Sequence, residues 1–171
     1  MHTCNPMPDL LMKSSVDKKT AVQIATAARS RGDIVVFTNG CFDLLHKGHR
    51  FLLEAARKEG DYLIVGLNSD ESVRQLKGEG RPVRSEKERA KVLLATDAVD
   101  LVTLFKEETP MELIRLIKPD VLVKGGDYRP EEIIGADVVK GRGGRLVTIP
   151  LLSGFSTTEI IEGRSEGKSS T

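Results

Sequence analysis

Residues 37–57, FTNGCFDLLHKGHRFLLEAAR, decide the fold of this chain. The stretch begins in an apolar run, turns at Gly40, and continues into a segment whose apolar residues have helical spacing. Strand, turn and helix in this order predict one β–α unit of a parallel sheet. Two of the three histidines, His46 and His49, lie three residues apart in the first turn of that helix. This spacing places both rings on one helix face.

The alternation of short apolar runs and helical patterns continues along the chain. The strands are expected at residues 33–38, 61–68, 99–105, 119–126 and 144–150, and further helices at 17–30, 86–96 and 110–118. The runs are apolar on both faces, as in parallel strands covered by helices on each side. The pattern therefore predicts an α/β fold with a doubly wound, Rossmann-like parallel sheet of about five strands.

Length and charge limit the domain organisation and the partners. A chain of 171 residues predicts one domain, which we expect at 17–162, with an N-terminal extension at 1–16 and a disordered, dispensable polar tail at 163–171. The 26 basic and 25 acidic residues give a net charge of +1, so no global field would hold nucleic acid or an anionic membrane. No secretory signal and no disulfide framework is evident, which favours the cytoplasm.

The histidine turn has the features of a phosphate site. The free N–H groups and the positive dipole end of a helix N-terminus attract phosphate, and Gly48 lets a ligand approach the backbone closely. Two alternatives are a pair of surface histidines and a metal site that adds Asp43 or Cys41. The position after a buried strand favours phosphate, and the metal site lacks a convincing further ligand.

The stretch GCFDLLHKGH (residues 40–49) resembles the G-x-F-D-x-x-H-x-G-H signature of the nucleotidyltransferase superfamily, which includes the cytidylyltransferases. These enzymes transfer a nucleotidyl group from an NTP to a phosphorylated small molecule and release pyrophosphate. The resemblance implies the fold of this superfamily. It also implies that His46 and His49 stabilise the negative charge that develops on the phosphates during transfer.

A second motif, GFSTTEII (residues 154–161), follows the last predicted strand. Ser156 and Glu159 can form a capping box of a short helix, which is the structural alternative. The segment also resembles the S-T-T motif of the cytidylyltransferases, which implies that Ser156, Thr157 and Thr158 hold the leaving pyrophosphate. Some relatives carry an arginine just before this motif, whereas this chain has PLLSG.

Two further turns follow strands and carry charge. VKGGDY (123–128) offers a tight backbone turn for a flat base, with a cation at Lys124 and an acceptor at Asp127, although it also fits an ordinary strand-end turn. LKGEGRPVRSEKER (76–89) carries five cations. It fits either a solvated loop that enters a helix capped by Ser85 or a loop that binds the acceptor phosphate. For the second reading, Lys77 is the first candidate and Arg81 the next.

Taken together, these stretches resemble the family of D-glycero-β-D-manno-heptose 1-phosphate adenylyltransferases from about residue 17 to 162. The resemblance implies transfer of AMP from ATP to the heptose 1-phosphate, with Mg²⁺ bridging the phosphates, to give ADP-heptose for the lipopolysaccharide inner core. The implied nucleotide contacts are Thr38, Cys41, Phe42, Gly48, Lys124, Gly125, Asp127 and Ser156–Thr158. The implied acceptor contacts are Asn39, Asp43, Lys77 and Arg81.

The resemblance also sets the expected partners and the alternatives. Many relatives fuse this domain to a sugar kinase, for which 171 residues leave no room, so we expect a separate heptose kinase. Relatives often form dimers, so a homodimer is expected. The nearest alternative is a cytidylyltransferase that acts on glycerol 3-phosphate or a similar polyol phosphate. A non-catalytic nucleotide-binding module is the alternative from another class, and the intact histidine pair argues against it.

Overall fold

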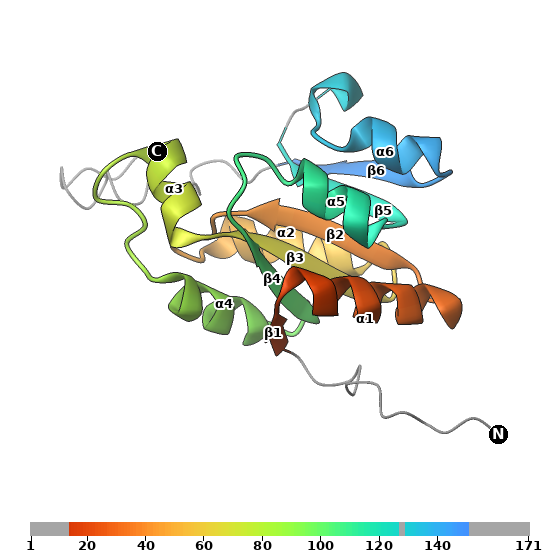
Figure 1. Cartoon of the computed structure of the whole chain (residues 1–171), viewed down its shortest axis with the longest axis horizontal. Coiled ribbons are helices and arrows are strands. Elements are labelled where there is room, and N and C mark those ends of the chain that lie inside the picture. The colour runs from red at the N-terminus through yellow and green to blue at the C-terminus, as the bar shows by residue number, and fades with distance from the viewer. Residues whose placement is uncertain (1–13, 127–128, 151–171) are drawn as a thin grey trace.

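The computed structural model describes residues 14–126 and 129–150, which form a six-stranded sheet flanked by helices (Figure 1). The strand order is β1-β4-β3-β2-β5-β6, and every pair is parallel. The strands are β1 (Ser14–Val16), β2 (Val35–Gly40), β3 (Tyr62–Asn68), β4 (Leu101–Phe105), β5 (Val121–Gly125) and β6 (Arg145–Ile149). The helices are α1 (Lys18–Ser30), α2 (Lys47–Arg57), α3 (Asp70–Lys77), α4 (Glu86–Leu94), α5 (Met111–Ile117), the 3₁₀ helix η1 (Pro130–Glu132) and α6 (Ala136–Gly141).

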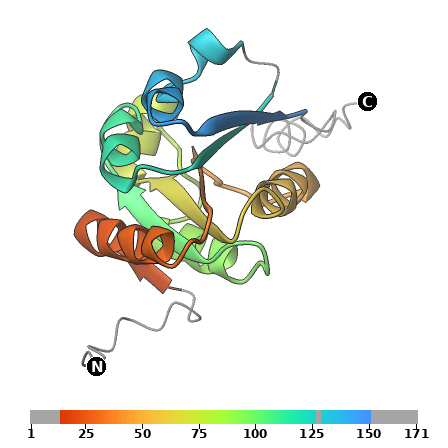
Figure 2. The ribbon, with the colours of Figure 1, turned by 90° about the vertical axis from the view of Figure 1, so that its right-hand side faces the viewer.

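Helices cover both faces of the sheet. Figure 2 shows α1 and α5 on one face and α2 and α4 on the other. Consecutive strand residues alternate between the two cores: Val35 and Phe37 pack with α1 and α5, whereas Val36 packs with α2 and α4. This explains the unbroken apolar runs, because both faces of each central strand are buried. The predicted doubly wound parallel sheet is confirmed.

The sheet has one strand more than the five that the apolar runs predict. The additional strand, β1, pairs through Ser14–Val16 with the edge of β4 and falls within the segment predicted as an extension. Helices η1 and α6 were also not predicted. Residues 1–13, 127–128 and 151–171 lie outside the described residues, and so do the S-T-T motif and the predicted boundary at 162.

Aspartates that precede the strands tie neighbouring strands together at their N-terminal ends. The Asp120 carboxylate accepts the Val35 N–H at 2.9 Å, which joins the start of β5 to β2. The Asp100 carboxylate accepts the Leu63 N–H at 2.8 Å, which joins the start of β4 to β3. These bonds satisfy backbone donors at the sheet edge and help to set the register of the strands.

The topology determines where a ligand can bind. The chain leaves β2 through α2 to β3 on one side, while β5 pairs with β2 on the other side. In open α/β sheets the ligand crevice lies outside the carboxyl ends of the two strands at which the order reverses, here β2 and β5. The turn that carries both histidines follows β2, so it lies at this crevice. Among the described residues, no helix has the length and apolar character needed to cross a membrane.

Candidate active site

His46 and His49 cap the N-terminus of α2. His46 is the N-cap residue, and its Nδ1 accepts the N–H of Gly48 at 3.1 Å and that of His49 at 3.4 Å. In return, Nδ1 of His49 accepts the His46 N–H at 3.4 Å. This is a reciprocal capping box in which imidazoles replace the usual hydroxyl and carboxylate. The rings stack with their centroids 3.8 Å apart and an interplanar angle of 20°.

The capping box fixes the tautomers of both rings. A neutral imidazole has one acceptor and one donor nitrogen, so an accepting Nδ1 leaves the proton on Nε2. Burial, with a smaller contribution from His46, lowers the pKa of His49 from 6.5 to about 4, although a hydrogen bond to the Leu44 backbone acts in the opposite direction. His49 is therefore neutral at neutral pH.

The turn between β2 and α2 is tight and strained. Phe42 has a φ of 46°, a left-handed conformation that is rare for an aromatic residue. Its ring packs edge-on against His49, with centroids 5.2 Å apart. A Cβ on Gly40 would lie 2.9 Å from the Phe42 ring, so only glycine fits there without a shift. Such strain is held in place by surrounding packing, and it is common at functional sites.

The ends of β2 and β5 bring together a hydroxyl, a thiol and a cation. Thr38 is 1% exposed, and within the described part of the chain its hydroxyl has no hydrogen-bond partner. Burial raises the pKa of the Cys41 thiol. Burial also lowers the pKa of Lys124, and the charge of Cys41 acts on it in the opposite direction. The interaction between Cys41 and Lys124 places the end of β2 beside the end of β5, where Gly125 also lies. Asp127 lies outside the described residues.

The Asp43 carboxylate accepts hydrogen bonds from other residues of the protein. This fully buried carboxylate accepts the N–H groups of Val83 at 2.9 Å and Arg84 at 3.0 Å, and Nε of Arg81 at 3.1 Å. Burial alone would raise the pKa of Asp43, but these hydrogen bonds bring it below its ordinary value. The sequence predicted that Asp43 faces the acceptor, whereas in the structure this carboxylate holds the segment that carries Arg81.

The other predicted acceptor residues lie around the same edge. Lys77 ends α3, and its positive charge acts on both Cys41 and His49, so it lies near the histidine turn. Arg81 lines a hollow of about 410 Å³ beside the segment between α3 and α4, together with the cation Arg74 and the carboxylates Asp70 and Glu79. Asn39 is half-buried near the end of β2. The structure therefore gathers the predicted cations at the edge where the histidines lie.

Arg89 was not predicted as a site residue. It is the most bulky of the fully buried side chains in the described part of the chain, with an exposure of 1%. One reading of the charged stretch 76–89 was a solvated loop that enters a helix capped by Ser85. One feature of the sequence pointed to burial: Arg89 lies four residues before Leu93, on the buried face of α4.

The described residues contain no group of three or more histidine, cysteine, aspartate or glutamate side chains that could hold a metal ion. Asp43, the carboxylate within the turn between β2 and α2, is already satisfied by hydrogen bonds from the protein. A divalent ion at this site would therefore be held mainly by the phosphates of a nucleotide and by water, as is usual for Mg²⁺.

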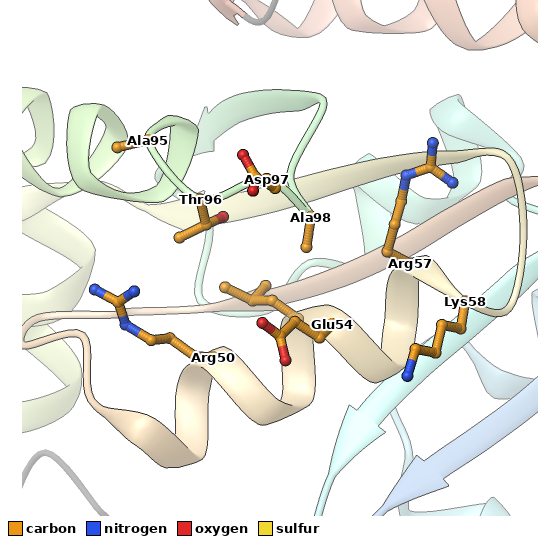
Figure 3. A pocket seen from close by; sticks show the side chains of 9 residues that line it. Arg50, Glu54, Arg57, Lys58, Ala95, Thr96, Asp97 and Ala98 are labelled. Atoms are coloured by element: carbon orange, nitrogen blue, oxygen red, sulfur yellow. The ribbon is translucent and has the colours of Figure 1, made fainter.

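A separate hollow of about 410 Å³ lies between α2 and residues 95–98 (Figure 3). Arg50, Glu54, Arg57 and Lys58 line it from α2 and the residue that follows the helix. Neither histidine lines this hollow. It lacks the donors of a helix N-terminus and is not the candidate active site.

The sequence model of the cytidylyltransferase-like family matches residues 37–163, from within β2 through both motifs. The chain belongs to the cytidylyltransferase-like family. The match covers more than half of the chain and includes the histidine turn, so the predicted membership of the nucleotidyltransferase superfamily is confirmed. The family also assigns the chain to the nucleotidyltransferases as an enzyme class.

Curated relatives are similar over most of this chain. The protein named "Bifunctional protein HldE" from Trichlorobacter lovleyi is 55% identical over 146 residues, which are 85% of this chain and 30% of that protein. The protein of the same name from Gluconobacter oxydans is 51% identical over 154 residues, 90% of this chain and 32% of that protein. The chain thus spans about a third of the length of these relatives.

Solved structures show the same fold. A lipopolysaccharide core biosynthesis protein from Thermoplasma volcanium matches with a TM-score of 0.61 and 27% identity, over 71% of this chain and 100% of that chain. Pantoate-beta-alanine ligase from Francisella tularensis matches with a TM-score of 0.58 over 90% of this chain and 77% of that chain. At 15% identity the second similarity concerns the fold alone.

Proposed function

We propose that this chain transfers AMP from ATP to D-glycero-β-D-manno-heptose 1-phosphate and releases pyrophosphate, which yields ADP-heptose for the lipopolysaccharide inner core. The observation that carries the transfer chemistry is the imidazole capping box at the start of α2. The acceptor is supported by the resemblance of the motifs to the heptose 1-phosphate adenylyltransferases and by identities of 51–58% with proteins named "Bifunctional protein HldE".

The reaction is an in-line displacement. An oxygen of the sugar phosphate attacks the α-phosphorus of ATP, the new P–O bond forms, and the bond to the leaving pyrophosphate breaks. No covalent intermediate on the protein is required, so catalysis depends on positioning and on stabilisation of the shifting negative charge. The N–H groups at the start of α2 and the Nε2–H donors of His46 and His49 supply this stabilisation.

The two substrates lie on either side of the histidine turn. Thr38, Cys41 and Phe42 line the nucleotide phosphates, Gly48 allows their close approach, and Lys124, Gly125 and Asp127 lie near the adenine. The hydroxyls of Ser156–Thr158 hold the leaving pyrophosphate. When bound with ATP, Mg²⁺ neutralises charge on the phosphates. Lys77 and Arg81 bind the acceptor phosphate, with Asn39 beside it, and the hollow that Arg74 and Arg81 share is large enough for a sugar.

The acceptor must be phosphorylated at its anomeric position before it reaches this site, so a kinase reaction has to supply it. The sequence predicts that this kinase is a separate protein and that the chain forms a homodimer. Both substrates are charged metabolites made inside the cell, which places the proposed reaction in the cytoplasm.

Pyrophosphate release with each NTP against a panel of sugar 1-phosphates and polyol phosphates tests the proposal. We expect ATP with the heptose 1-phosphate to give the fastest turnover. Faster turnover with CTP and glycerol 3-phosphate would replace the proposal with a polyol-phosphate cytidylyltransferase. Nucleotide binding without pyrophosphate release from any pair would indicate a non-catalytic binding module.

A further inference from the structure

The buried guanidinium of Arg89 connects four separate segments of the chain. Its Nη1 donates to the carbonyls of Cys41 and Asn68, both at 2.8 Å. Its Nε donates to the Arg84 carbonyl at 3.0 Å, and its Nη2 donates to the Asp70 carboxylate at 2.7 Å. A guanidinium has five N–H donors in a fixed plane, so this group is almost fully used by the protein itself.

The acceptors of these hydrogen bonds lie around the candidate site. Cys41 belongs to residues 40–46, here called the phosphate turn, and Arg84 belongs to residues 78–85, here called the acceptor loop. Asn68 ends β3 and Asp70 begins α3. One side chain thus joins the turn that carries the N-cap histidine to the loop that carries Arg81.

Asp43 joins the same two segments with the opposite charge. It lies in the phosphate turn and accepts N–H groups of the acceptor loop, among them that of Arg84. The Arg84 N–H therefore donates to Asp43, while the Arg84 carbonyl accepts from Arg89. Two buried charges hold one loop residue from both sides. Burying charges is costly even when they are satisfied, so their presence points to a need for fixed geometry.

We propose that Arg89 is a positioning residue for the transfer reaction, which rests on the proposed function. It acts through the Cys41 carbonyl and the Arg84 carbonyl to keep the phosphate turn and the acceptor loop at a fixed separation. Its side chain is fully buried, so it does not touch the substrates. A displacement of about 1 Å between reacting groups costs on the order of 10²-fold in rate, which is why such a brace matters for catalysis.

Lysine cannot replace this brace. Its ammonium is a single point with three donors, whereas the guanidinium reaches separate acceptors from the corners of a plane. Arg89→Lys therefore keeps the charge and loses the simultaneous contacts. We expect kcat to fall about 10- to 100-fold at a temperature where the variant is folded, with KM for ATP changed by less than about threefold.

Arg29→Lys is the matched control. Arg29 is partly buried and also donates to main-chain carbonyls, those of Ile117 and Lys118, but it lies on α1 away from the phosphate turn. We expect Arg29→Lys to lower the melting temperature and to leave kcat within about twofold of the wild type. A folded Arg89→Lys variant whose kcat also stays within about twofold would overturn the proposal.

A second pair of variants covers the case in which Arg89→Lys does not fold. Asp70→Asn removes the charged partner of Arg89 at a half-exposed position, and Glu71→Gln makes the same charge change one residue later without contact to Arg89. Because Asp70 also lines the hollow that Arg74 and Arg81 share, the labelling rate of Cys41 described below separates a direct effect on the acceptor from loss of positioning. We expect kcat to fall by about threefold to tenfold in Asp70→Asn only. Equal kcat values in these two variants would contradict the proposal.

The Cys41 thiol provides a readout that is independent of turnover. In a Cys4→Ser background, we expect Arg89→Lys or Asp70→Asn to raise the labelling rate of Cys41 by a thiol reagent, because the half-buried thiol becomes more accessible when the turn is released. Unchanged labelling in both variants would show that Arg89 does not hold the turn. If the wild type releases no pyrophosphate with any substrate pair, the proposed function fails, and the labelling rates still decide whether Arg89 braces the turn.

Discussion

His46 and His49 each accept a backbone N–H of the other through Nδ1, at 3.4 Å in both directions, while their rings stack 3.8 Å apart. The same contacts that cap α2 therefore leave Nε2 as the donor nitrogen of each ring. Helix capping and the proposed phosphate chemistry use different nitrogens of the same side chains. Substitutions that keep one role and remove the other can separate them.

His49→Gln should lose catalysis and keep the fold. Glutamine is a usual partner at this position of a capping box, so it can still accept the His46 N–H. Loss of one transition-state donor should lower kcat by about 10²–10³-fold, with ATP affinity within about tenfold of the wild type. Single-turnover pyrophosphate release and thermal unfolding on one preparation test this. His49→Ala, which also loses the cap, should be less stable than His49→Gln by about 1 kcal/mol. Normal turnover of His49→Gln would mean that the imidazole is not catalytic.

The two histidines should not act additively. His46→Asn keeps a good N-cap residue and removes the other imidazole. Because both rings serve one developing charge, the double variant His46→Asn/His49→Gln should lose less activity than the product of the two single losses. The same pyrophosphate assay on the two single variants and the double variant measures the coupling. Strictly multiplicative losses would show that each ring acts on a separate step.

Acid should destabilise the protein through His49. Its pKa is lowered to about 4 in the folded chain, against 6.5 for an ordinary histidine, so the unfolded chain binds more protons between these values. The free energy of unfolding therefore rises with pH across this window, and the contribution of His49 is lost as pH falls from 6.5 toward 4. Urea unfolding of the wild type and His49→Gln from pH 4 to 7 tests this. The wild type should lose more stability than the variant as the pH falls. Parallel curves of unfolding free energy against pH would contradict the lowered pKa of His49.

Asp43→Asn should release the acceptor loop. The amide cannot accept all three hydrogen bonds, and Arg81 loses its buried counter-charge. We expect the free energy of unfolding to fall by about 3 kcal/mol, and KM for the acceptor to rise more than KM for ATP. Asp33→Asn is the control, because Asp33 pairs with Arg31 at the surface, where such a bridge contributes at most about 1 kcal/mol. Equal effects of the two substitutions on stability and KM would argue against a loop clamp.

Asp120→Ala should reduce stability without affecting the chemistry. The carboxylate accepts the Val35 N–H at the edge of the sheet opposite to the histidine turn. Its loss leaves that donor unsatisfied and should cost about 1–2 kcal/mol in the free energy of unfolding, with unchanged kcat below the melting temperature. Asp97→Ala, at an exposed position, should have little effect. A lower kcat in folded Asp120→Ala would show that the two edges of the sheet are coupled.

The central strands were predictable because the apolar residues of each strand follow one another in the sequence. Strands β2, β3 and β5 are buried on both faces, so their apolar runs stand out in the sequence, and their ends were predicted to within two residues. Strand β1 has only three residues. That is too short for a pattern, and it forms because the edge of β4 offers unpaired hydrogen-bonding groups.

The sequence by itself determined the parallel sheet, the position of the histidine pair at a helix start, and the family to which the motifs belong, because spacing along a helix or strand follows from local geometry. Only the tertiary structure decided which groups the buried charges of Asp43 and Arg89 bind. Asp43 bonds to Val83, and Arg89 bonds to Cys41, across long stretches of the chain. Whether a charged side chain meets a substrate or a backbone group depends on which loops fold over it, and that is decided by contacts between distant segments.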